Sequence, residues 1–195
     1  MYRIVIAVAL ALLVLDLKAQ EHAQTNEPHE QHEHHGMKGA NRLTLGLGHT
    51  HVSRGLVDGK REWLVVPSWS LNFDHWVSDK WAVGIQSDLI LETFVIENNE
   101  GVEFEREKPV TLVPVAIYKP GKRFEILGGI GGEFAKGHNF VLTRLGVEYG
   151  FHIPGNWEVG AALVWDNKWG YYNTWGLAFT FSKIWPRKKI SGLAD

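Results

Sequence analysis

The chain has no cysteine among its 195 residues. This absence excludes disulfide bonds, a lipid-modified N-terminal cysteine and thiolate metal sites. Any transition metal must therefore be bound by histidine and carboxylate side chains. A basic surplus is also missing, because the formal net charge is −2. The composition therefore excludes the electrostatic pattern of a nucleic-acid-binding domain.

Long apolar runs are missing from the interior of the chain. The longest run, Ile4–Leu15, lies at the N-terminus behind Arg3, and no later run reaches the roughly 18 to 20 residues of a membrane-spanning helix. Leu17-Lys18-Ala19 places a small residue before Gln20. This pattern predicts a secretory signal peptide over residues 1–19, with an uncleaved anchor as the alternative.

Residues 20–41 form a polar tract without hydrophobic periodicity, and we predict that this tract is disordered. Five of the ten histidines lie in Glu21–Gly36. Neutral imidazoles bind zinc and copper, and neighbouring glutamates can complete the ligand set. The predicted metal ligands in this arm are His29, His32, His34 and His35. The alternative is a solvated or acid-responsive linker.

Residues 42–185 show a period-two alternation of apolar and polar side chains, broken by turn sequences rich in Gly, Pro, Asn and Asp. No segment here has the periodicity of a helix. The pattern predicts an all-β fold, an eight-stranded antiparallel up-and-down barrel, followed by a basic tail over residues 186–195. The expected strands are Leu43–Leu47, Trp63–Phe73, Trp81–Leu91, Val110–Tyr118, Phe124–Phe134, Val141–Phe151, Trp157–Trp165 and Tyr171–Phe181.

The two faces of these strands differ in a way that predicts which face points inward. One face carries Gly, Ser, Thr and isolated carboxylates with very few lysines, which suits a narrow lumen; the other is large and aromatic, as a lipid-facing band should be. The predicted polar network of the lumen comprises Gln86, Asp88, Glu92, Glu133, Arg144, Glu148, Glu158 and Asp166. With Arg144 as its main cation, this network is either a cation site or a hydrogen-bonded plug. A secreted or periplasmic soluble barrel with an apolar interior is the alternative fold.

Tryptophans are expected to form two girdles, one at each membrane interface. We assign to them Trp63, Trp76, Trp81, Trp157, Trp165, Trp169 and Trp185. Pro67 and Pro114 lie inside expected strands, where each removes a hydrogen-bond donor, so we expect bulges there. His49 and His51 share one strand face and are a further candidate metal pair. The alternative is two polar residues at the barrel rim.

The eight two-sided strands and the ending Leu177-Ala178-Phe179-Thr180-Phe181 resemble the small eight-stranded bacterial outer-membrane β-barrels over about Arg42–Trp185. The Ala19-Gln20 signal ending is similar to those of secreted Bacteroidetes proteins. The resemblance implies an outer-membrane location with lipid as a partner. It leaves structural, adhesive, binding and lipid-modifying roles open. For a lipid-modifying enzyme the candidate residues are Ser68, Ser70, His75 and His138.

The sequence thus favours a non-catalytic outer-membrane barrel with both termini in the periplasm and a His-rich arm that binds or buffers zinc or copper. A purely structural barrel is the second hypothesis and the lipid-modifying enzyme the third. Nothing in the sequence indicates an oligomeric state.

Overall fold

The computed structural model describes residues 37–98 and 100–187. The predicted signal peptide, the four arm histidines and most of the basic tail lie outside these residues. In the described part of the chain no helix is long and apolar enough to cross a membrane. The described residues form ten strands: β1 (Asn41–Val57), β2 (Lys60–Trp76), β3 (Trp81–Ile90), β4 (Phe94–Glu97), β5 (Glu103–Arg106), β6 (Val110–Tyr118), β7 (Phe124–Phe134), β8 (Asn139–Ile153), β9 (Trp157–Lys168) and β10 (Tyr172–Trp185).

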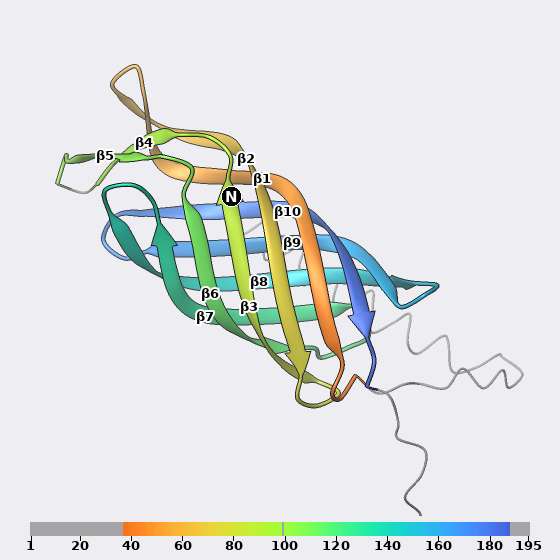
Figure 1. Ribbon diagram of the computed structural model, residues 1–195. Coiled ribbons are helices and arrows are strands. Elements are labelled where there is room, and N and C mark those ends of the chain that lie inside the picture. The colour runs from red at the N-terminus through yellow and green to blue at the C-terminus, as the bar shows by residue number, and fades with distance from the viewer. Residues whose placement is uncertain (1–36, 99, 188–195) are drawn as a thin grey trace, which may run out of the picture.

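Eight of these strands form a closed antiparallel barrel, so the predicted fold is confirmed. Neighbours along the chain pair as hairpins, β3 pairs with β6, and β10 closes the barrel by pairing with β1 from Asn41↔Trp185 to Val52↔Thr174. We call the end that carries Asn41 and Trp185 the terminal end, and the opposite end the distal end. Figure 1 shows the start of β1 and the end of β10 together at the terminal end.

The alternation along each strand places apolar side chains outside and polar side chains inside. On β1, Leu43, Leu45 and Leu47 are exposed while Arg42 and Thr44 are buried. Exposed apolar side chains on β2, β3, β6, β7, β8 and β10 continue this belt, and Phe179 reaches 82% exposure. A soluble barrel with an apolar interior is therefore not the fold of this chain.

Two features of the distal end were not predicted from the sequence. First, β1 and β2 are 17 residues long each and extend beyond the barrel wall. Second, β4 and β5 form a short hairpin inside the β3–β6 connection, and β4 pairs with β1 at Gly55↔Ile96. The hairpin lies over the distal end beside the tip of the β1–β2 hairpin (Figure 1).

Bulges at Pro67 and Pro114 were expected, and the pairing shows that this expectation was wrong. The β1–β2 register runs through His49↔Pro67 without a shift, and the β6–β7 register is the same on both sides of Pro114. The register shift lies instead between Val52 and Gly55, where Arg54 adopts a positive φ of 61°. This irregularity marks the point where the β1–β2 hairpin leaves the barrel wall and meets β4.

Candidate functional site in the barrel lumen

The terminal half of the lumen is organised around Arg42 of β1, which is 2% exposed. Its Nε donates to Asp74 at 3.0 Å, and its two terminal nitrogens donate to Glu125 at 3.0 and 2.8 Å. The same nitrogens reach Glu158 at 3.1 Å and Glu148 at 3.4 Å. One guanidinium group thus gathers four carboxylates from four other strands. We call these residues, together with Lys119, the terminal cluster.

Lys119 is the second cation of the terminal cluster, and Trp76 packs against the cluster. Lys119 Nζ donates to Glu125 at 2.7 Å and lies 3.9 Å from Glu158. Both cations lie over the Trp76 ring, at 5.9 Å for Arg42 and 5.5 Å for Lys119. Trp76 is fully buried, so its assignment to an aromatic girdle was wrong. It stands near the membrane interface but on the same strand face as Asp74, and that face points inward.

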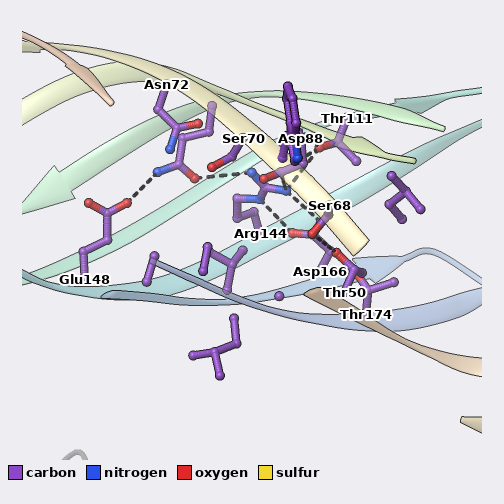
Figure 2. Close-up of a pocket in the computed structure, with 18 of the residues that line it drawn as sticks. Thr50, Ser68, Ser70, Asn72, Asp88, Thr111, Arg144, Glu148, Asp166 and Thr174 are labelled. Atoms are coloured by element: carbon purple, nitrogen blue, oxygen red, sulfur yellow. Dashed lines mark hydrogen bonds and ion pairs between the residues drawn. The ribbon is translucent and has the colours of Figure 1, made fainter. Parts of the chain in front are cut away.

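The middle of the lumen is held by Arg144 of β8. Its guanidinium donates to both oxygens of Asp166 at 2.8 Å, to Asp88 at 2.5 Å and to Gln86 at 3.3 Å. Lys168 adds a second cation, which donates to Asp166 at 3.3 Å and to Thr174 at 2.6 Å. Figure 2 shows Asp88, Asp166 and Thr111 around the Arg144 guanidinium.

The distal half of the lumen is closed around Glu133 of β7, which is fully buried. Arg106 donates to Glu133 from Nε at 3.0 Å and from Nη2 at 2.6 Å, and the Tyr172 hydroxyl donates to it at 2.5 Å. Arg106 belongs to β5, so the hairpin above the barrel reaches down into the lumen. Beside it lies an apolar layer formed by Val52, Val66, Ile90, Phe94, Ile96, Phe140 and Tyr172.

A cavity of about 40 Å³ lies in the middle of the lumen. This volume accommodates about three water molecules. One wall carries the long polar side chains around Arg144, and the other carries small residues such as Ser68, Ser70 and Gly176. A Cβ added at Gly176 would meet no atom within 4 Å. The arrangement is chemically suited to holding a few waters, and an eight-stranded barrel leaves no room for a wide channel.

The structure places most of the predicted lumen network inside the barrel. Gln86, Asp88, Glu133, Arg144, Glu148, Glu158 and Asp166 all belong to inward-facing positions. Glu92 does not, because β3 ends at Ile90 and Glu92 is exposed in the following loop. Its assignment to the lumen extended the alternation two residues too far.

Six charged lumen residues were not predicted from the sequence, and they change the charge balance of the interior. They are Arg42, Asp74, Arg106, Lys119, Glu125 and Lys168. Arg144 is therefore not the main cation, but one of five. Strand alternation already places Arg42, Asp74 and Glu125 on the polar face. Arg106 lies outside the expected strands, so no periodicity marked it.

His49 and His51 lie on the outer face of β1, as the alternation requires. His49 is opposite Leu177 and Pro67, and His51 is opposite Trp175 and Val65. Among the described residues no group of three or more His, Asp or Glu side chains is placed to hold a metal ion. The pair therefore has no third protein ligand within this part of the chain.

Six of the seven predicted girdle tryptophans point outward. Trp63, Trp81, Trp169 and Trp185 are exposed, and Trp157 and Trp165 are half-buried. Trp81, Trp157 and Trp185 lie at the terminal end, and Trp63, Trp165 and Trp169 lie toward the distal end. Trp157 stacks on Phe181 at a centroid distance of 4.7 Å. The outer surface thus has an aromatic band near each end, as a membrane-spanning barrel requires.

The residues considered for a hydrolytic enzyme are not brought together. Ser68 and Ser70 face the cavity. His75 lies at the terminal end, where its Nδ1 is 2.8 Å from the Asn41 amide oxygen, and His138 lies in the distal β7–β8 loop. A nucleophilic serine needs a base within hydrogen-bond reach. Within residues 37–98 and 100–187, neither histidine forms a hydrogen bond with either serine.

Several solved structures resemble this barrel. The attachment invasion locus protein Ail of Yersinia pestis, solved with the heparin analogue sucrose octasulfate, is 12% identical; the match covers 74% of this chain and 99% of Ail, with a TM-score of 0.51. Outer membrane protein AlkL, solved in lipid bilayers, is 12% identical over 87% of this chain and 100% of AlkL, with a TM-score of 0.52. Neisserial surface protein A is 8% identical over 75% of this chain and 99% of its own, with a TM-score of 0.50.

No protein-family model and no curated protein sequence match the chain. At these identities the structural likeness shows the fold alone. The chain is a small eight-stranded β-barrel of the outer-membrane type. This fold and its belt of exposed apolar and aromatic side chains point to the bacterial outer membrane as its location.

Proposed function

We propose that this protein is a non-catalytic outer-membrane barrel with a sealed lumen. It holds the β1–β2 and β4–β5 hairpins on the outer surface and its two termini in the periplasm. The observation that carries this proposal is the continuous filling of the lumen. From the terminal to the distal end, the lumen is filled by the terminal cluster, then by Arg144 with Asp166, and then by Arg106 with Glu133. We call the second set, which includes Asp88 and Lys168, the Arg144 group, and the third the Arg106 group. An apolar layer lies at the distal end of this series, and a second apolar cluster runs along the lumen from Trp76 at the terminal end to Leu142.

The seal is tested by conductance of the full-length, refolded protein in planar lipid bilayers. We expect no stable single-channel steps at neutral pH, because every charged side chain of the middle and distal lumen is ion-paired or hydrogen-bonded. Replacing residues 92–108 by a short Gly-Ser turn removes Arg106 together with Phe94 and Ile96 of the distal layer, and we expect this variant to leak. Stable conductance by the wild-type protein would overturn the proposal.

We further propose that the N-terminal arm binds a divalent transition metal, zinc or copper, through His29, His32, His34 and His35. The observation in favour is the run of histidines interleaved with Glu27, Glu30 and Glu33. β1 begins at Asn41, so the arm joins the barrel at its terminal end. A passive buffering role follows, since the metal is held by a tether and not by the barrel.

Calorimetric titration of the mature protein in detergent with Zn²⁺ and Cu²⁺ tests the metal role, with a version that begins at Met37 as the matched control. We expect micromolar or tighter binding that is lost on truncation. Binding that survives truncation would move the site to His49, His51 or the lumen. If neither form binds, the purely structural barrel is the better description. Lipid turnover that disappears in Ser68→Ala or Ser70→Ala would instead indicate the enzyme.

A further inference from the structure

The charges of the lumen are unevenly distributed. The Arg144 and Arg106 groups contain three carboxylates, Asp88, Glu133 and Asp166, against three cations, Arg106, Arg144 and Lys168. The terminal cluster contains four carboxylates, Asp74, Glu125, Glu148 and Glu158, against two cations, Arg42 and Lys119. The surplus of acid among the described lumen residues is therefore confined to the terminal half.

The four carboxylates do not share the two cations equally. Asp74 and Glu125 take the short contacts with Arg42, at 2.9 and 2.8 Å, and Glu125 also accepts from Lys119. Glu148 has only long contacts, at 3.4 Å to Arg42 and 3.3 Å to the Gln86 amide. Glu158 lies 3.1 Å from Arg42 and 3.9 Å from Lys119, so Glu148 is the carboxyl group least neutralised by the two cations.

Two buried carboxyl oxygens of the terminal cluster have no hydrogen-bond partner. They are Glu158 Oε2 and Asp74 Oδ1, on side chains that are 5% and 1% exposed. A buried anionic oxygen without a donor is costly, whereas a protonated carboxyl oxygen loses most of that cost. Carboxylates gathered within a few ångströms also oppose one another's ionisation. Both effects favour the neutral form of part of this cluster.

We infer that the terminal cluster is a proton-binding site, in which Glu148 holds a proton that offsets part of the surplus of acid at neutral pH. A metal ion in its place would need ligands that point at a common centre, and the described residues offer no such group. The charged and titratable groups around Glu148 come from every neighbouring element. They are Arg42 of β1, Asp74 of β2, Lys119 after β6, Glu125 of β7, His152 of β8 and Glu158 of β9, with the Gln86 amide on β3.

The site has a connection to the terminal rim. His152 is 47% exposed, and its Nδ1 lies 3.3 Å from Oε2 of Glu158, which is also 3.9 Å from Lys119 Nζ. Glu158 and Glu148 both contact Arg42, so this contact links the cluster to the solvent at the terminal rim. As the pH rises, loss of the bound proton would increase the surplus charge and loosen the terminal seal.

Infrared spectroscopy of the full-length protein, refolded in lipid, tests this inference directly. At neutral pH we expect a carbonyl-stretch band from protonated carboxyl groups, which lies apart from the carboxylate bands. The band should decrease as the pH is raised, and it should be lost in Glu148→Gln. Glu105→Gln on the exposed face of β5 is the matched control and should leave the band unchanged. A wild-type protein without the band, or a Glu148→Gln variant that retains it, would overturn the inference.

Unfolding in urea gives an independent readout. A glutamine resembles a protonated glutamate in shape and charge, so Glu148→Gln should leave the unfolding midpoint at neutral pH unchanged. Glu125→Gln removes the carboxylate that both cations share, so it should lower the midpoint. Equal losses for the two variants would mean that Glu148 is ionised, against the inference. The wild-type infrared titration decides the matter even if Glu125→Gln does not fold.

Discussion

Arg144 shows why a barrel this narrow has charged side chains in its interior. Its guanidinium is 2% exposed and contacts Asp88 and Asp166 from opposite sides of the lumen. The planar fork of an arginine can donate to both oxygens of one carboxylate and still reach a second carboxylate, whereas a lysine ammonium acts as a compact point charge. A single side chain thus links β3, β8 and β9 across the lumen.

Removing this arginine should be strongly destabilising, because it leaves the buried Asp166 and the half-buried Asp88 with one fewer cation. For Arg144→Gln we expect a loss of about 3–5 kcal/mol in the free energy of unfolding, the usual result of breaking a buried ion pair from one side. Urea unfolding in detergent micelles measures it. Lys136→Gln, at a side chain that is 86% exposed, is the control and should lie within error of wild type. A similar, small effect for both would show that water fills the place of Arg144.

Glu97 of β4 and Arg61 of β2 link the two distal hairpins outside the barrel wall. Arg61 donates a hydrogen bond to the carboxylate, and this holds the pKa of Glu97 below its ordinary value. A lowered pKa means that the contact is complete above the ordinary pKa of a glutamate. The contact is then lost as the pH falls through the lowered value.

Backbone amide NMR shifts of Phe94–Glu97 should therefore remain constant around neutral pH and move in acid. In Glu97→Gln they should show no such titration. Because exposed ion pairs contribute little to stability, the unfolding midpoint of this variant should match that of wild type. Titration of the same amides in Glu97→Gln would assign the transition to another group.

The barrel strands could be predicted from the sequence because each buries one face and exposes the other to lipid. Where that two-sided environment ends, the prediction failed. β4 and β5 are four residues each, so they have too few alternations to be recognised. They form the hairpin over the distal end and are not part of the barrel wall. The distal half of β1 was missed because His49 and His51 interrupt its apolar face.

The polar character of the lumen was predicted from the sequence, but the contacts between its side chains were not. Alternation assigns a residue to a face, but it carries no information on which side chains meet across the lumen. Arg42 and Glu125 are 83 residues apart, and their contact depends on barrel closure and strand stagger. Trp76 was misplaced for the related reason that its position along the strand was considered without its face.

The lipid-facing belt of β7 predicts a depth-dependent cost for charge. Ile130 is 58% exposed in the middle of β7, and Ile153 is 39% exposed at the terminal end of β8. We expect Ile130→Arg to lower the free energy of unfolding in lipid vesicles by about 2–4 kcal/mol and Ile153→Arg by only about 0–1 kcal/mol. Guanidine titrations monitored by tryptophan fluorescence would measure both. Equal costs would place Ile130 away from the bilayer midplane.

The even number of barrel strands leaves both ends of the described chain on one side of the molecule, with the β4–β5 hairpin on the other. The two sides therefore differ in the connections between their strands. The terminal side carries short turns such as Val77–Lys80, and the distal side carries the extended β1–β2 hairpin together with β4 and β5. Longer connections on the outer surface and short turns on the periplasmic side are the usual arrangement of such barrels.

Single cysteines can test this orientation, because the native chain has none and every label then reports one position. Lys136→Cys lies in the distal β7–β8 loop, and Lys80→Cys lies in the terminal β2–β3 turn; both side chains are exposed. With a polymer-linked maleimide too large to cross the outer membrane, we expect intact cells to label Lys136→Cys only. Lys80→Cys should react once the outer membrane is disrupted, and the wild-type protein should remain unlabelled throughout. The reverse pattern would place the termini and the arm outside the cell, where a periplasmic metal buffer could not work.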